Sequence, residues 1–528
     1  MTISDDQRRW YTLGAMCFAL FMIMLDNTVV NVALPSIQRD LNVSISNLEW
    51  TVNAYTLTFA VLLVTGGRLG DIFGRRRMFL FGVAAFGASS LFIAFAQTDA
   101  WLIAGRAAQG VGAAFMMPAT LSIIANAFPP HERGKAIGTW AGASAIALAI
   151  GPVVGGFLVE NVSWQSIFLI NVPVAVLAVA VTLWATHESR DESAPRLVDI
   201  PGVLTVSLGL GAIVLALVEG NGWGWGSPRV IVLLAGGLLG MVAFVVVERR
   251  SAAPMVDFAF FRSRSFLGAN LVAFIVSFAM LAMFFFLALY MQNIRGYSPL
   301  QAGVRFLPST VVIIVAGPVA GRLADKVGPR ILMATGLVFV AISLFWQGHL
   351  NPHTPYSFLI GAFALMGLGM GLVMSPMSTA AMNAVDQAKA GVASGVLSMS
   401  RMVGGTFGVA IVGALISGLG RSRLQELLPG APSARIDHLT DTLANGGAGV
   451  GGRAGQAVQI AFVDAMNTSL RIGSAVALLG ALIAWLLIAD RPQQPGVQPV
   501  AEDLAAAAGP GTIDPRPARP GAREPARA

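Results

Sequence analysis

Apolar stretches of about 20 residues, the length of a membrane-crossing helix, follow one another along most of the chain. An α-helix of that length spans the ~30 Å hydrocarbon core of a bilayer, so each stretch predicts one transmembrane helix. Polar runs separate these stretches at Gln38–Ser46, Arg68–Arg77, Gln97–Asp99, Pro129–Lys135, Glu160–Trp164, His187–Asp199, Glu219–Arg229, Glu248–Arg264, Gln292–Ser298, Arg322–Arg330, His349–Pro355, Asp386–Lys389 and Arg421–Asp464. The thirteen connections predict fourteen helices, numbered here as spans 1 to 14.

The distribution of basic residues predicts which side of the membrane each connection faces. Even-numbered connections are rich in arginine and lysine, as in the run Arg75–Arg77, whereas the short odd-numbered ones hold only Arg39, Arg229 and Arg295. Cytoplasmic connections of membrane proteins carry the excess of positive charge. We therefore expect both termini and the even connections to be cytoplasmic, and the Gly/Ala-rich connection at about 419–468 to be external.

Composition agrees with a membrane protein: 55% of the 528 residues are hydrophobic and 12% are charged, against about 25% charged residues in soluble proteins. The net charge of +7 lies mostly in arginines of the connections. Anionic lipid headgroups explain this charge without nucleic acid binding. Cys17 is the only cysteine, so no intrachain disulfide is expected. The first apolar run is too long for a signal peptide and indicates an uncleaved first span.

One charged decapeptide occurs twice. GRLGDIFGRR occupies residues 67–76 and GRLADKVGPR occupies residues 321–330, in the connections after spans 2 and 10. Two six-helix halves related by an axis along the membrane normal would place equivalent connections six spans apart. Because these lie eight apart, the sequence predicts six helices, two inserted helices and six more. A weaker echo links GVGAAFMMP (110–118) in span 4 with GLGMGLVMSP (367–376) in span 12.

We therefore expect an all-α polytopic membrane protein built from five segments. They are a cytoplasmic N-terminus (1–10), a first six-helix half (11–186), a linker with two extra helices (187–265), a second six-helix half (266–489) and a disordered cytoplasmic tail (490–528), which is rich in Pro, Ala and Gly.

Four motifs make the chain resemble the major facilitator superfamily, and in particular its fourteen-span drug:proton antiporter branch. Besides the decapeptide, they are LDNTVVNVALP (25–35) in span 1, RAAQGVGAAFMMPA (106–119) in span 4 and AIALAIGPVVGGF (145–157) in span 5. With the span count, the resemblance covers nearly all of residues 10–490. It implies the major facilitator fold and a proton-driven exporter of amphipathic drugs or other toxic small molecules that works by alternating access.

The decapeptide suits a contact between helix ends. Gly67 and Gly74 permit close approach and a tight turn. Asp71 is able to accept hydrogen bonds from a facing helix N-terminus while it pairs with arginine. In the family this cluster latches the two halves in one conformation, and the resemblance implies the same here, with a purely topogenic arginine cluster as the alternative. The expected latch residues of both copies are Gly67, Asp71, Gly74, Arg75, Arg76, Asp325 and Arg330.

Asp26 is an ionisable residue inside span 1, and such residues are costly in a membrane and functional by default. Helix rise places Asp26 about 22 Å from the cytoplasmic end of span 1 and Arg106 about 7 Å from the external end of span 4. Both residues then lie at nearly the same depth and are able to pair. The resemblance implies that this pair couples transport to protons; the alternative is a fixed ion pair. The second half has Phe363 at the position equivalent to Arg106.

Two further features are candidates for function. Small residues crowd span 5, and the resemblance associates its antiporter signature, Gly151, Pro152, Gly155 and Gly156, with antiport, although ordinary helix packing explains the glycines equally well. Pro152 is expected to bend the helix. Arg401 lies deep in span 13, where we expect a structural or gating pair rather than contact with a drug.

The sequence argues against an enzyme. All five histidines lie in or near connections without metal-ligand spacing, and no phosphate loop of the form GxxxxGK[ST] occurs. We expect no metal and no cofactor, with the proton gradient as the energy source. The expected partners are protons, lipid and an amphipathic, mostly apolar and in part cationic small molecule, and a monomer is the simplest assembly. High Ala, Gly and Arg content suggests a bacterial inner membrane.

Two other functions remain open on the same fold, because fold does not fix the direction or the substrate of transport. One is dedicated export of a single self-made metabolite, such as an antibiotic or a siderophore. The other is proton-coupled import.

Overall fold

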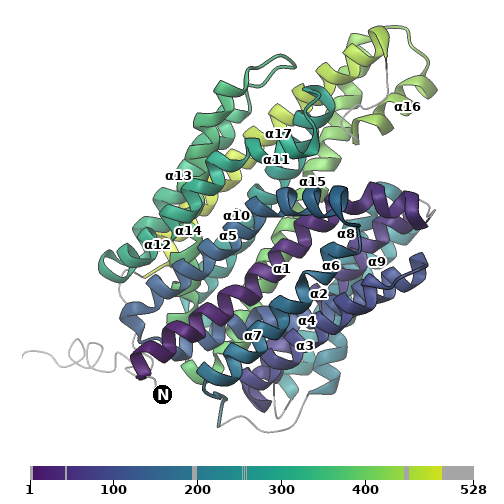
Figure 1. Cartoon of the computed structure of the whole chain (residues 1–528). Coiled ribbons are helices and arrows are strands. Elements are labelled where there is room, and N and C mark those ends of the chain that lie inside the picture. Colours follow the sequence, from purple (N-terminus) through teal and green to yellow (C-terminus); the bar gives the residue numbers. More distant parts are fainter. Residues whose placement is uncertain are drawn as a thin grey trace, which may run out of the picture. The chain divides into compact units, whose positions relative to one another are not determined.

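The computed structural model describes residues 4–41, 45–192, 199–251, 254, 256, 258–444 and 451–489. The tail at 490–528, predicted to be disordered, lies outside these residues. Every regular element in the described residues is helical (Figure 1). The elements are α1 (Asp5–Leu41), α2 (Ile45–Phe73), α3 (Arg75–Ala94), α4 (Asp99–Ala127), α5 (Pro130–Asn161), α6 (Ser166–Leu169), α7 (Asn171–Ala185), α8 (Ile200–Trp223), α9 (Pro228–Arg250), η1 (Phe258–Arg262), α10 (Arg264–Leu289), η2 (Tyr290–Ile294), α11 (Pro299–Arg305), α12 (Leu307–Val327), α13 (Pro329–Gln347), α14 (Tyr356–Asn383), η3 (Gln387–Lys389), α15 (Ala390–Leu427), α16 (Ser433–Ala444) and α17 (Gly452–Leu487).

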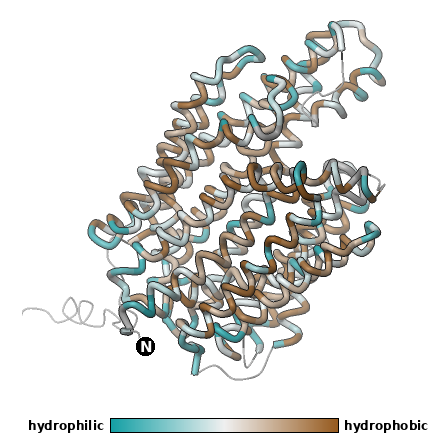
Figure 2. Tube along the Cα trace, viewed as in Figure 1, coloured by the Kyte–Doolittle hydropathy of each residue, from teal (hydrophilic) through white to brown (hydrophobic). Residues whose placement is uncertain are grey.

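The helices match the predicted spans in number and order. Thirteen segments of the described chain are long and apolar enough to cross a membrane, and the 32-residue α5 adds the fourteenth. Span 6 combines α6 with α7, span 9 combines α10 with η2, and span 10 combines α11 with α12. Polar residues gather toward the helix ends and apolar ones along the helix bodies (Figure 2). The all-α architecture predicted from the apolar stretches is thereby confirmed.

The two halves repeat the same helix contacts. In the first half α4 packs against α2 and α3, and in the second α14 packs against α12 and α13. Glycines permit the close approach at equivalent positions: a Cβ added to Gly82 would lie 2.8 Å from the carbonyl oxygen of Gly112, and one added to Gly336 would lie 2.8 Å from that of Gly369. The duplication visible in the decapeptide therefore extends through the helix packing.

The inserted helices α8 and α9 pack tightly on each other, since a Cβ on Gly240 would meet the Cα of Gly209 at 2.7 Å. Helix α8 also contacts one helix of each half, α2 and α15. The contact is an apolar cluster of Ala60, Leu210 and Val214, against which Met399 and Val403 of α15 pack. The insertion thus covers the line along which α2 meets α15.

The segment predicted as a long external connection is mostly helical where the structure describes it, and residues 445–450 lie outside the description. Helix α15 continues to Leu427, α17 begins at Gly452, and α16 packs against both. Ile436, Leu439 and Leu443 bury one face of α16. Their i, i+3, i+7 spacing is the helical signal that the Gly/Ala-rich composition concealed.

Candidate proton site and cytoplasmic latch

Asp26 of α1 and Arg106 of α4 form a buried ion pair. Arg106 Nη1 lies 2.5 Å from Asp26 Oδ2, and each side chain is about 1% exposed. The helix rise had placed the two residues at one depth, and the structure brings them into direct contact.

Three polar side chains surround this pair, and with it they form what we call the Asp26 cluster: Asp26, Arg106, Gln109, Ser90 and Asn171. Gln109 accepts a hydrogen bond from Arg106 at 2.6 Å and donates to Asp26 Oδ1 at 2.9 Å. Gln109 also donates to Ser90 Oγ at 2.8 Å. Asn171 donates to Asp26 and to Ser90, both at 3.3 Å. Side chains from four helices, α1, α3, α4 and α7, therefore meet in this cluster.

Arg106 is also tied to α2. Its Nε donates to the carbonyl oxygen of Thr51 at 2.9 Å, and its guanidinium lies 4.4 Å from the centre of the Tyr55 ring. A cation over an aromatic face is attracted by the ring quadrupole. Consequently, any movement of α1 relative to α2 and α4 would stretch the contact between Asp26 and Arg106.

The chemistry of the cluster follows from burial. Removing one partner of a buried ion pair leaves an uncompensated charge in a medium of low dielectric, which costs several kcal/mol. Protonation of Asp26 has the same electrostatic effect on Arg106, because the carboxylate loses its charge. The site is therefore able to convert the uptake of a proton into a force on α4. Among the described residues, no group of His, Cys, Asp or Glu is arranged to hold a metal ion.

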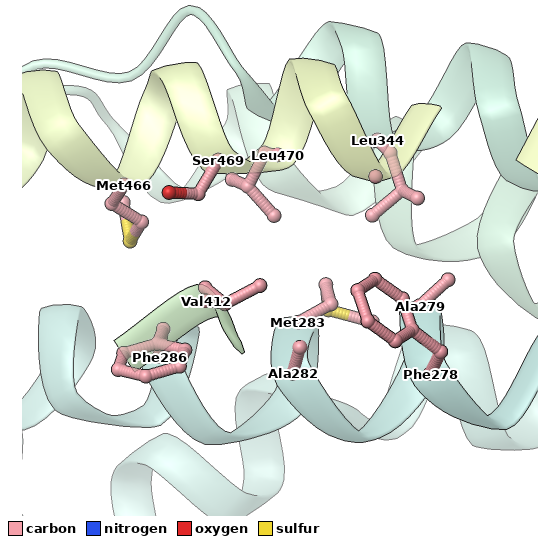
Figure 3. A pocket seen from close by; sticks show the side chains of 11 residues that line it. Phe278, Ala279, Ala282, Met283, Phe286, Leu344, Val412, Met466, Ser469 and Leu470 are labelled. Carbon is pink, nitrogen blue, oxygen red and sulfur yellow. The ribbon is translucent and has the colours of Figure 1, made fainter. Parts of the chain in front are cut away.

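The second half has apolar residues at the positions equivalent to Arg106 and Ser90. Phe363, fully buried, stands where the duplication places Arg106, and Leu344 stands where it places Ser90. Leu344 lines a cavity between α10, α13, α15 and α17 that has room for about one water molecule, together with Phe278, Met283 and Met466 (Figure 3). The cavity is far too small for a drug-sized compound.

The first decapeptide closes a contact between the halves. Asp71, at the end of α2, accepts hydrogen bonds from the backbone N–H groups of Gly391 at 2.9 Å and Val392 at 2.8 Å, in the first turn of α15. A carboxylate at a helix N-terminus satisfies unpaired N–H groups and complements the helix dipole. A Cβ on Gly67 would overlap the carbonyl oxygen of Gly391, so the crossing requires glycine.

Arg75, the first residue of α3, completes this contact. Its Nε and Nη2 donate to Asp71 Oδ1 at 2.8 and 2.6 Å. Nη2 also donates to the carbonyl oxygens of Gln387 at 3.0 Å and Ala388 at 2.5 Å, across the boundary between the halves. Both side chains are about 1% exposed or less, so the charges are neutralised within the contact.

The second decapeptide makes the mirror contact with α5. Asp325 Oδ1 accepts from the backbone N–H of Gly134 at 3.2 Å, and Gly321 lies directly against the carbonyl group of Gly134. Ser375 donates to that same carbonyl at 3.1 Å, and Arg133 donates to Asn383 at 2.9 Å. We call these contacts and those of Asp71 and Arg75 the cytoplasmic latch.

The other expected latch residues, Gly74, Arg76 and Arg330, make contacts of a different kind. Arg76 donates to the carbonyl oxygen of Thr186 at 3.1 Å, and its backbone N–H donates to Glu188 at 3.0 Å. Gly74 has φ = 111°, and a Cβ there would lie 2.6 Å from the Glu188 carboxyl carbon, so this glycine serves the turn. The Arg330 guanidinium lies 4.6 Å from the ring centre of Trp485, within the second half.

The hydrogen bonds described above between the two halves lie at the helix ends predicted to be cytoplasmic. Besides those above, Gln387 donates to the carbonyl oxygens of Ala125 and Asn126 at 3.3 and 3.2 Å. The structure therefore has its predicted cytoplasmic end closed.

The span 5 signature divides into two parts. A Cβ on Gly151 would overlap the side chain of Thr28, and one on Gly155 would lie 3.1 Å from Val29 Cγ1. These two glycines bring α5 against α1 just beyond Asp26. Gly156, in contrast, has no neighbouring atom within 4 Å of such a Cβ, so close packing does not explain it. The side chain of Pro152 lies outside the described residues.

Arg401 lies in α15 and is half-buried. The gating or structural pair expected for it is not formed by the described residues, among which Arg401 has no hydrogen-bond or ion-pair partner.

Comparison with known proteins identifies the family. A model of the Major Facilitator Superfamily matches residues 16–409. This chain belongs to the major facilitator superfamily, and it is a multi-pass membrane transporter rather than an enzyme.

Its curated relatives include three bacterial proteins. The Tetracenomycin C resistance and export protein of Streptomyces glaucescens is 32% identical over 504 residues, which cover 92% of this chain and 93% of the relative. Puromycin resistance protein pur8 of Streptomyces alboniger is 37% identical over 493 residues, with the same coverage of 92% and 93%. Multidrug resistance protein Stp of Mycobacterium tuberculosis is 37% identical over 407 residues, covering 77% and 75%.

Solved structures share the fold. The proton:xylose symporter XylE aligns with a TM-score of 0.62 at 13% identity, covering 92% of this chain and 97% of that one. The human organic anion transporter MFSD10 aligns with a TM-score of 0.60 at 13% identity, covering 90% and 99%. At this identity the likeness concerns the fold alone.

Proposed function

We propose that this protein is a proton-driven antiporter that exports amphipathic small molecules across a bacterial cytoplasmic membrane by alternating access. The observation that carries the proposal is the Asp26 cluster, in which one buried carboxylate is balanced by one arginine from another helix. A membrane-embedded carboxylate of this kind is a suitable proton carrier, because its charge depends on a partner that helix movement is able to withdraw.

The transport cycle follows from the two sites. With the cytoplasmic latch closed, a proton from outside binds Asp26 and cancels its attraction for Arg106. The helices around the cluster then rearrange, the latch opens, and the substrate enters from the cytoplasm. Withdrawal of the proton to the cytoplasm restores the ion pair, and the contacts of Asp71 and Arg75 with α15 re-form. One proton thus moves inward for each outward movement of substrate in the simplest cycle.

Export rather than import is supported by the curated relatives, whose names describe resistance or export. The close contact of Gly151 and Gly155 with α1, next to Asp26, is consistent with a helix that prevents proton leakage there. The names also keep the dedicated exporter as a second candidate, since the Streptomyces glaucescens relative is named for export of a single compound. Under that alternative, one metabolite would be transported and a general panel of drugs would not.

The experiment is proton flux in inverted membrane vesicles that are energised by respiration, with a dye reporting the pH gradient. Drugs and antibiotics are added one at a time. A compound that dissipates the gradient in vesicles with the protein, and not in vesicles without it, supports antiport. If no compound dissipates the gradient, and uptake of the same compounds into the vesicles is independent of an imposed pH gradient, proton-driven export is refuted.

A further inference from the structure

Arg401 is a charge that the cycle above leaves unused. It lies eleven residues after the start of α15 at Ala390, which places it about 17 Å along the helix and close to the middle of a ~30 Å membrane. Arg106, which lies deep in α4, is neutralised by Asp26. Arg401, in contrast, has no carboxylate partner among the described residues.

The side of α15 that carries Arg401 lies beside α10 and away from the inserted helix α8. Met399 and Val403, each two residues away, pack on the cluster formed by α2 and α8 at the periphery. Residues two apart lie on opposite sides of a helix, so Arg401 faces away from this cluster. Gly404 and Gly408 share a face of α15 with Arg401, and they meet Phe274 and Phe278 of α10.

Two serines share this face of α15 with Arg401 and lie between it and the latch; we call the face of Ser394, Ser398 and Arg401 the α15 stripe. Ser394 and Ser398 precede Arg401 by seven and three residues, the spacing of neighbours on one helix face. Both are buried, and the hydroxyl of Ser394 has no hydrogen-bond partner in the described structure. Unpaired buried polar groups are unusual and call for a ligand or water.

The stripe is closed on one side and half-open on the other. The latch contacts of Gly391 and Val392 close the cytoplasmic end of the α15 stripe. At the other end, the side chain of Arg401 is half-buried. A guanidinium in this position offers several donors in a fixed plane, which match the oxygens of a carboxylate or a sulfonate. An unpaired arginine in a membrane interior marks a substrate or ion pathway.

We propose that Arg401 binds the anionic group of the transported molecule. The preferred substrates are then amphipathic compounds that carry a carboxylate or a sulfonate, and cationic compounds are disfavoured. This inference rests on the proposed function for its meaning, and it revises the expectation of partly cationic substrates. It also replaces the expected gating pair at Arg401 with contact to the substrate.

The test measures equilibrium binding to the full-length protein in nanodiscs of neutral phosphatidylcholine, with empty nanodiscs as background. Two fluorescent probes share one scaffold and differ in charge: 8-anilinonaphthalene-1-sulfonate is anionic and N-phenyl-1-naphthylamine is neutral. We expect Arg401→Gln to weaken binding of the sulfonate about tenfold or more, the worth of a hydrogen bond to a charged group. Binding of the neutral probe should stay within about twofold of the wild type, a change below 0.5 kcal/mol.

Two control variants test whether the effect is specific to the charge at Arg401. Arg401→Lys keeps the charge and should retain most of the sulfonate affinity. Arg435→Gln removes an arginine from the exposed surface of α16 and should change neither probe. Equal losses for both probes in Arg401→Gln, or no loss for either, would overturn the proposal and return Arg401 to a structural role.

A measurement on the wild type keeps the proposal testable if Arg401→Gln does not fold. Displacement of the neutral probe by 1-naphthoate should require less compound than displacement by 1-naphthamide, and equal potency would contradict the inference. Adding phosphatidylglycerol to the nanodiscs separates the possible sources of the anion: competition with the sulfonate in wild type would assign the site to a lipid phosphate and refute the substrate role. Because these readouts involve binding alone, a failure of proton antiport would defeat the proposed function without deciding this inference.

Discussion

At the scale of single residues, the contact between Asp26 and Arg106 is the feature on which the proposed proton coupling depends. Arg106→Gln would leave Asp26 with the amide partners Gln109 and Asn171 but without a cation. A lone charge in this buried site is unfavourable, so the variant lacks the charge balance on which the proposed coupling relies. We expect uptake driven by a pH gradient to fall about tenfold or more, whereas exchange of labelled for unlabelled substrate, which needs no net proton movement, persists.

Both activities of Arg106→Gln are measured in the same proteoliposomes, with Arg435→Gln as the charge-removal control. Loss of exchange together with gradient-driven uptake would mean that Arg106 maintains the fold rather than the coupling. Retention of both would mean that the ion pair has no part in the cycle.

Only part of the Asp26 cluster could be predicted from the sequence. The pairing of Asp26 with Arg106 follows from helix rise and opposite chain direction alone, since these fix depth. Gln109, Ser90 and Asn171 were not predicted, because an uncharged polar residue in a span has many possible partners. Gln109 did carry a signal, since it lies three residues after Arg106 and therefore on the same face of α4. Asn171 carried none beyond its polarity.

At the scale of helices, we expect the two aspartates of the cytoplasmic latch, Asp71 and Asp325, to stabilise the closed state to different extents. Asp71 joins two backbone N–H groups and the buried Arg75, at distances of 2.6 to 2.9 Å, whereas Asp325 meets Gly134 at 3.2 Å. We expect Asp71→Ala to shift the protein toward the open cytoplasmic state by at least tenfold, since it leaves Arg75 without its carboxylate. Asp325→Ala should shift it less.

The state of the latch is measured by labelling a cysteine placed at Ser394, which is fully buried with the latch closed. Cys17, the only native cysteine, is first replaced by serine. A membrane-impermeant maleimide added to inverted vesicles should label Ser394→Cys slowly, and Asp71→Ala should accelerate the reaction. Equal rates with and without Asp71 would show that the latch does not control access.

Helix contacts through glycine give a prediction about stability. Gly110 of α4 faces α2, where a Cβ would lie 2.5 Å from the carbonyl oxygen of Tyr55. Gly110→Ala must separate the two helices, at a cost of about 1–3 kcal/mol, and should lower the midpoint of thermal unfolding. Gly156→Ala meets open space and should change the free energy of unfolding by no more than about 0.5 kcal/mol. Equal midpoints for the two variants would contradict the packing described.

Helices were the most predictable level of the structure, and α16 shows the limit. Membrane-spanning helices are recognised by their length and hydrophobicity, and both can be read from a single sequence. In contrast, α16 is short and polar on most of its surface, and only its packing against α15 and α17 gives it a buried face. The partners of Asp71 at Gly391 and Val392 were likewise out of reach, because they lie far along the chain and contribute backbone groups rather than side chains.

At the scale of the whole molecule, duplication supplies the scaffold and the differences between the copies supply function. The glycine contacts of the latch recur in both halves, at Gly67 with Gly391 and at Gly321 with Gly134. The ion pair does not recur, since Phe363 replaces Arg106. The repeat was legible in the sequence because it conserves charged residues in connections. The polarity difference between the halves became meaningful only once Asp26 was seen at the meeting point of four helices.

The central claim of the proposed function is that Asp26 carries the proton that is exchanged for the substrate. It is tested most directly by proton release from purified protein in weakly buffered detergent solution, at a pH where the wild type binds protons, when a substrate identified by vesicle assays is added. Wild type should release about one proton per bound substrate, as expected for a single titrating carboxylate. Asp26→Asn should bind the substrate and release none. Proton release of equal size from Asp26→Asn would contradict the account, because the coupling proton would then reside elsewhere.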